Sequence, residues 1–117
     1  MILEKAKEIG RLIGQSDEYK ALRRAEDRVK DMPEVRTPLD QLQQLQNELE
    51  DAAVKDGRPS DDQIARYNAL VTAIQGFAVY QEVVAAQTNF DKLMLKVNQE
   101  ILAGIKLGAA SPIITLS

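Results

Sequence analysis

The chain of 117 residues has the length of one domain, and its apolar fraction of 44% includes few aromatic residues (4%) and no tryptophan. Such an aliphatic composition is typical of helices packed on helices, so we expect an all-α fold. The chain has no cysteine and no histidine, which excludes disulfides, zinc sites of the usual kind and catalysis by either residue. A net charge of −3 also disfavours non-specific binding to nucleic acids.

The same sequence predicts a cytoplasmic protein. Residues 1–14 alternate charged and apolar side chains and lack the uninterrupted apolar stretch of a signal peptide. No run approaches the ~20 apolar residues of a membrane span. The absence of cysteine fits a reducing compartment.

Two helices are expected in the first third of the chain. The apolar residues of the first recur every three or four positions and share one face: Ile2, Ala6, Ile9 and Ile13. Ser16 is a good N-terminal cap for the second helix, and Asp17 and Glu18 suit its positively polarised first turn. Pro33 is expected to end that helix.

Two more helices are expected before residue 76. The third should begin with Thr37 as its cap and Pro38 at the first helical position, and a turn at Gly57 should end it. Its apolar stripe is narrow: Leu39, Leu42, Leu45 and Leu49. Ser60 and Gln63 have the spacing of a capping box for the fourth helix.

Residues 77–107 contain no proline and predict one helix of ~30 residues, about 45 Å long. A compact domain of this size has a radius of gyration near ~13 Å, so the helix should extend beyond its own fold. Its apolar stripe then needs cover from a second chain, which predicts a dimer or tetramer. The residues of this predicted interface are Tyr80, Val83, Gln87, Phe90, Met94, Val97 and Ile101.

Polar Gln87 leaves two interpretations open. A polar residue within an apolar seam can fix register and oligomeric state, whereas a residue at the edge of the stripe would bind water. We expect a single helical domain over residues 1–107, followed by a tail at 108–117. The tail residues Ile113, Ile114 and Leu116 are either disordered, as termini often are, or dock on a partner.

Lys20, Arg24 and Arg28 form a basic ridge, spaced by four along the second predicted helix. Such a ridge could contact phosphates or an acidic partner. Because Glu26, Asp27 and Asp31 lie among these cations, an ordinary solvated surface is the simpler interpretation. The acidic pair Asp61 and Asp62 is explained by its place in a first helical turn, and we expect no catalytic residue, metal or cofactor.

Several segments resemble the YlbF/YmcA family, with its YheA-like relatives, over residues 3–105. They are Ser16-Asp17-Glu18-Tyr19, Ala86-Gln87-Thr88-Asn89-Phe90 and Val97-Asn98-Gln99-Glu100-Ile101. The resemblance implies an all-α protein that self-associates through long helices and acts as a regulator or adaptor. Characterised relatives act in competence, sporulation and biofilm control, and work with a ribonuclease that processes messenger RNA.

Some of those regulators carry cysteines tied to an iron–sulfur cluster, which a chain without cysteine cannot bind in that way. Family resemblance transfers fold more safely than role. The leading hypothesis is therefore a non-enzymatic, homo-oligomeric adaptor with a protein partner and no small-molecule substrate. The alternative is an RNA-binding module that uses the basic ridge.

Overall fold

The computed structural model describes residues 1–110, and these form five α-helices. They are α1 (Ile2–Gly14), α2 (Asp17–Lys30), α3 (Pro33–Asp56), α4 (Asp61–Gln75) and α5 (Ala78–Ala109). The expected all-α fold and the long final helix are confirmed. The predicted tail residues Ile113, Ile114 and Leu116 lie outside the described part of the chain.

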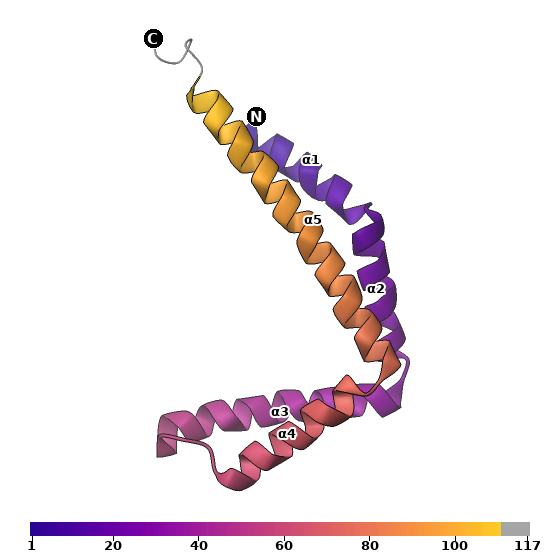
Figure 1. The fold of residues 1–117 in the computed structure, drawn as a ribbon, viewed down its shortest axis with the longest axis vertical. Coiled ribbons are helices and arrows are strands. Elements are labelled where there is room, and N and C mark those ends of the chain that lie inside the picture. The colour runs from indigo at the N-terminus through magenta and orange to yellow at the C-terminus, as the bar shows by residue number, and fades with distance from the viewer. Residues whose placement is uncertain (111–117) are drawn as a thin grey trace.

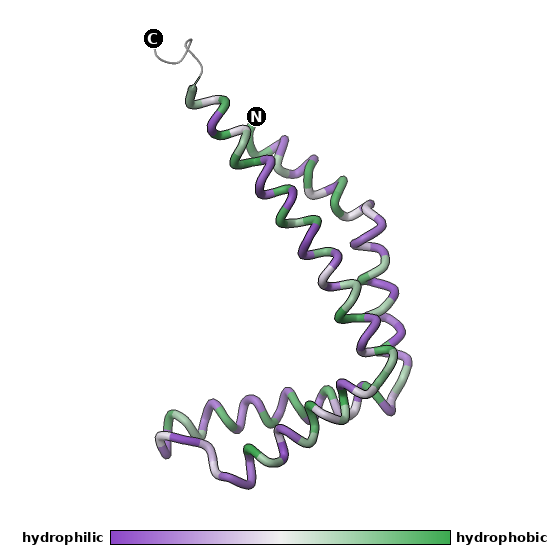
Figure 2. The backbone as a smooth tube through the Cα atoms, in the orientation of Figure 1, coloured by the Kyte–Doolittle hydropathy of each residue, from purple (hydrophilic) through white to green (hydrophobic). Residues whose placement is uncertain are grey.

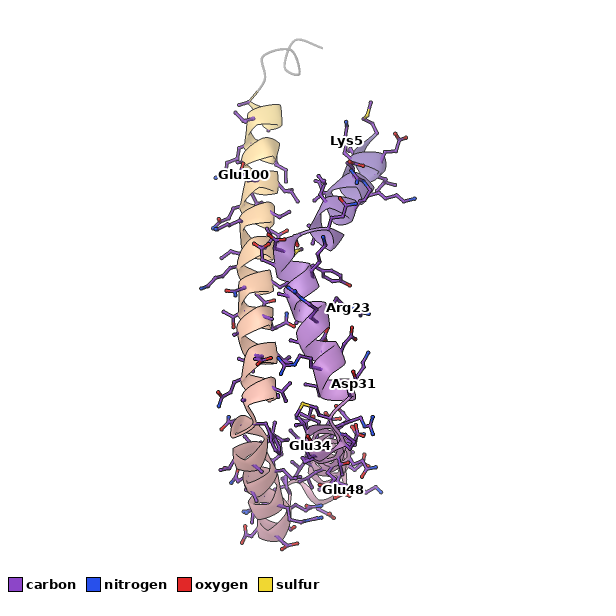
Figure 3. All side chains as sticks on the ribbon, turned by 90° about the vertical axis from the view of Figure 1, so that its right-hand side faces the viewer. Lys5, Arg23, Asp31, Glu34, Glu48 and Glu100 are labelled. Carbon is purple, nitrogen blue, oxygen red and sulfur yellow. The ribbon has the colours of Figure 1, made fainter. Side chains whose placement is uncertain are left out.

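The helices form two arms that meet at an elbow (Figure 1). In the long arm α2 packs along α5, and α1 continues beyond α2 and diverges from the distal half of α5 (Figure 3). In the other arm α3 and α4 form an antiparallel hairpin. The chain bends by 84° between α4 and α5. The elbow is therefore the one place where α2, α3, α4 and α5 come together.

The shape is far more extended than that of a compact domain. The radius of gyration is 21.3 Å and the extents are 66 × 37 × 20 Å, against about 13 Å for a compact chain of this length. The accessible surface is 8981 Å², whereas a compact protein of this mass exposes about 6,300 Å². Much surface that a compact fold would bury is thus open.

Local side-chain hydrogen bonds explain where two of the helices begin, and a glycine conformation explains where a third ends. The Ser16 hydroxyl accepts from the backbone N–H of Tyr19 at 3.1 Å. Ser60 and Gln63 form the reciprocal capping box, with distances of 3.2 and 2.9 Å. Gly57 ends α3 in the left-handed region at φ 81°. These predicted caps are confirmed, because each depends on a side chain and its own neighbouring backbone.

The predicted start of α3 is wrong. The helix begins at Pro33, five residues before Pro38, which lies inside its second turn. Val35 in the first turn is fully buried, and Arg36 donates to the carbonyl of Lys30 at 2.8 Å. Pro33 also satisfies the preference for proline at the first helical position. Burial at the elbow therefore sets the start of the helix. Pro38 is tolerated inside the helix although it lacks a backbone N–H, because it lies near the N-terminal end.

The apolar contacts between α2 and α5 form the core of the long arm. Leu22 and Ala25 on α2 pack with Ala86 on α5, and Val83 and Phe90 cover them. The ring of Tyr19 lies 5.7 Å from that of Phe90, tilted by 56°. A tilted aromatic pair at this distance adds to the apolar burial.

The most deeply buried side chains lie at the elbow. Val35 and Ile74 are the largest side chains that are fully buried, and Val79 at the start of α5 is 4% exposed. Along the hairpin, Leu45 and Ala52 of α3 are buried as well. The elbow and the α2–α5 contact are therefore closed by the chain itself.

Candidate interaction surface

Helix α1 has an apolar face but buries none of its residues. Ile9 and Leu12 are 36% and 54% exposed, and Ile2 near the start of the helix is 82% exposed. Figure 3 shows α1 leaning away from α5, with Lys5 on α1 well separated from Glu100 on α5. The apolar face of α1 is therefore left largely exposed, because α1 diverges from α5.

A groove lies where α1 and α5 diverge. Ile9 from α1 lines one side, and Val97 and Ile101 from α5 line the other, with Lys96 and Glu100 at its border. Its volume is about 510 Å³. We call this the distal groove. Its apolar lining, open to solvent, has the character of a surface that binds another apolar side chain or helix.

Exposed apolar residues concentrate on α1 and on the distal half of α5. Of the thirteen large apolar side chains that are exposed in residues 1–110, nine lie on α1 or on α5 from Leu95 onward. Ile101, Ile105 and Leu107 are 45%, 60% and 75% exposed. Isolated apolar residues on a surface are ordinary, but their concentration at one end of the long arm makes that end the candidate interaction surface.

The predicted interface residues fall into two groups. Val83 and Phe90 pack against α2 within the chain, and Tyr80 is half-buried near the elbow. Met94 and Val97 are half-buried, and Ile101 is exposed beside the distal groove. The oligomer interface itself stays a prediction, but only the distal members of the stripe are open to a partner.

Gln87 is exposed, and its side-chain amide donates to Asp91 Oδ1 at 2.9 Å on the same helix. This partner one turn away agrees with the interpretation of Gln87 as an edge residue. Such a bond between residues four apart stabilises a helix slightly.

The basic ridge remains on the surface of α2. Lys20, Arg24 and Arg28 are all exposed. Arg28 forms an ion pair with Glu82 of α5, and both side chains are about half exposed. The pair holds α2 beside α5 and places an acidic group next to the ridge, which lowers its attraction for phosphates.

No group of three or more acidic, histidine or cysteine side chains within residues 1–110 is placed to hold a metal ion. Over the same residues no single helix is long and apolar enough to span a membrane; only α4 and α5 taken together meet the length and composition criteria, across their 84° bend.

Sequence reasoning missed the distal groove and the exposed Leu95, Leu102 and Ile105 of α5. A signal for these three was available, since Leu95 and Leu102 are seven residues apart and Ile105 follows by three. The groove had no such signal, because it depends on the angle between α1 and α5.

Comparison with known families decides the affiliation of the chain. A family model described as control of competence regulator ComK, YlbF/YmcA, matches residues 2–106. The chain belongs to this family. The match runs from the start of α1 almost to the end of α5, so the resemblance expected from the sequence is confirmed. No curated protein and no solved structure matched the chain.

The family is described by regulation and not by a reaction. A regulatory role therefore agrees with the description of the family.

Proposed function

We propose that the chain is a non-enzymatic, cytoplasmic adaptor that self-associates through its distal groove and binds a further protein through the rest of its surface. The observation that carries this proposal is the set of apolar side chains left open where α1 and α5 diverge, Ile9, Val97 and Ile101 among them. Burying one Ile or Leu side chain contributes about 1.5–3 kcal/mol. Burial of several such residues from each chain contributes toward the entropy that association costs.

The area available supports self-association. The accessible surface exceeds that of a compact protein of the same mass by roughly 2,600 Å². A standard protein interface removes about 800 Å² from each partner. The excess belongs to the whole extended chain, and its size is compatible with a second copy bound at one end and another protein bound elsewhere.

The hairpin of α3 and α4 is the proposed site for that other protein. It points away from the distal groove (Figure 1), so self-association there leaves it free. Residues 33–75 hold eight acidic and four basic side chains, while the whole chain is only slightly acidic. A partner surface of positive potential would be attracted to this arm.

Sedimentation velocity at micromolar concentration tests the self-association. We expect the wild type to exceed the mass of one 13.0 kDa chain, and Ile101→Asp to reduce the mass of the assembly. An unpaired carboxylate in an apolar contact should weaken the contact about 100-fold or more. Ala103→Asp is the matched control, because Ala103 is exposed and lies on the opposite side of the same turn.

Circular dichroism of each variant checks that the helices are retained, which is expected because Ile101 is 45% exposed in the single chain. A monomeric wild type at micromolar concentration would contradict the proposal. So would equal masses for Ile101→Asp and the wild type.

RNA binding by the basic ridge has less support, because Arg28 is engaged with Glu82. Titration of a structured RNA at low and high salt tests this alternative. Contacts to phosphates must weaken as salt rises.

A further inference from the structure

A second groove lies between α3 and α4, on one side of the hairpin. Its apolar lining combines Leu45 of α3, which is 4% exposed, with Ala69 and Leu70 of α4. Its polar lining consists of Gln41, Gln44, Glu48 and Arg66. The volume is about 460 Å³, within the range of roughly 300–1,000 Å³ that is usual for ligand pockets. We call this the hairpin groove.

The hairpin carries the negative charge of the molecule. Residues 33–75 hold eight acidic and four basic side chains, whereas the rest of the chain holds ten acidic and eleven basic ones. Figure 2 shows hydrophilic and hydrophobic residues alternating along both helices of the hairpin. An apolar groove on an acidic arm is therefore complementary to a surface that is both apolar and basic.

An arginine of the chain itself shows how a cation lies at this groove. Arg66 Nη2 is 3.6 Å from Glu48 Oε2 on α3, and Arg66 Nε is 3.6 Å from Asp62 Oδ2. Both distances exceed the roughly 2.7–2.9 Å of a charge-assisted hydrogen bond. The side chains of Glu48 and Asp62 are 53% and 86% exposed. Both carboxylates can therefore accept hydrogen bonds from a further cation.

We propose that the hairpin groove binds a basic amphipathic helix of a partner protein. The inference rests on the proposed function, which places the second protein on the hairpin. The apolar side of the partner helix packs on Leu45, Ala69 and Leu70, and a lysine or arginine beside it binds Glu48. This is the helix-in-groove mode of recognition. Gln41 and Glu48 are about 10 Å apart along α3, which is room for one or two apolar side chains of the partner.

A synthetic helical peptide of leucine and lysine, with the leucines on one face, serves as the probe. Fluorescence anisotropy measures its Kd for the full chain. We expect binding that weakens as salt rises, and no binding of the same peptide with glutamate in place of every lysine. Glu48→Gln should weaken binding about fivefold. Glu50→Gln is the matched control, because Glu50 is exposed, does not line the groove and lies about 160° from Glu48 around α3.

Two further variants change the groove itself. Ala69→Leu fills it and should weaken binding about tenfold, whereas Ala53→Leu, at an exposed position of α3 outside the groove, should not. Arg66→Gln removes the cation that competes for Glu48 and should strengthen binding about threefold. A purely structural role of Arg66 would not strengthen it. Circular dichroism should show retained helices, because the side chains of Glu48 and Arg66 are more than half exposed.

Equal Kd values for the wild type, Glu48→Gln and Ala69→Leu would overturn this inference and leave the proposed self-association standing. Equal binding of the glutamate peptide would also overturn it. A reduced mass of the assembly for Ala69→Leu but not for Ala53→Leu would assign the groove to a second copy, against this inference. A monomeric wild type with groove-dependent peptide binding would support the inference and contradict the proposed self-association.

Discussion

The two ends of α5 have similar apolar content and opposite surroundings. Near the elbow, Val79 and Ala86 are 4% and 9% exposed. Toward the other end, Ile101 and Leu107 are 45% and 75% exposed. The difference arises because α2 and α4 contact the first half of α5, whereas α1 diverges from its other end (Figure 3). One helix thus takes part both in the stability of the chain and, we propose, in its association.

The largest expected effect is the loss of stability when a buried side chain at the elbow is shortened, compared with the same change at an exposed position. Ile74→Ala should reduce the free energy of unfolding by about 2–5 kcal/mol, because Ile74 is 2% exposed and its loss leaves a cavity. Ile64→Ala on the same helix is the matched control, since Ile64 is 40% exposed. Its effect should be about 1 kcal/mol. Urea unfolding measures both, and equal losses would contradict the closed elbow.

A substitution at the free end of the hairpin tests whether a capping hydrogen bond far from the elbow contributes to stability. Ser60→Ala removes the hydroxyl that accepts from Gln63 N–H and should cost about 1 kcal/mol. Ser60→Thr keeps a capping hydroxyl and should cost clearly less. Thermal unfolding followed by circular dichroism measures both variants, and equal costs would show that the capping bond does not contribute.

The ion pair between Arg28 and Glu82 tests what holds α2 against α5. Both side chains are about half exposed, so a double-mutant cycle with Arg28→Gln and Glu82→Gln should give a coupling below about 1 kcal/mol. The coupling should also fall as salt rises. A large, salt-independent coupling would show that the pair, and not the packing of Leu22 and Phe90, closes the proximal part of the long arm.

The smallest effect concerns α1. The hydrogen-bonded guanidinium of Arg11 lowers the pKa of Glu8 below its ordinary value of 4.5. The stabilisation of α1 by this pair is therefore fully present above pH 4.5 and is lost as the pH falls through the lower pKa of the folded state. NMR titration of the Glu8 carboxyl measures the shift, and Arg11→Gln should return it to the ordinary value. An unshifted Glu8 would contradict the contact.

Sequence reasoning succeeded for features that depend on nearby residues. Ser16, Ser60 and Gly57 each mark a helix end through their own side chain or backbone geometry. It failed at Pro38, because the buried Val35 extends α3 toward the elbow. At that position, burial against other helices outweighs the local preference of Pro38 for the first position of a helix.

The candidate surface shows the same division. The apolar stripe of α5 could be recognised from its spacing, but the spacing does not say which members α2 covers. Phe90 packs beside Tyr19 within the chain, while Ile101 on the same stripe remains exposed. Which residues of the stripe are covered within the chain depends on the length of α2 and on the direction of α1.

By itself, the sequence determined the all-helical fold, most helix ends, the family and the unusual length of α5, because periodicity, caps and composition act over a few residues or along one helix. Only the tertiary structure decided the start of α3, the 84° bend, the distal groove and which apolar residues of α5 stay exposed. Those features depend on the angles at which helices pack, and the packing angle is set by contacts between residues far apart in the chain.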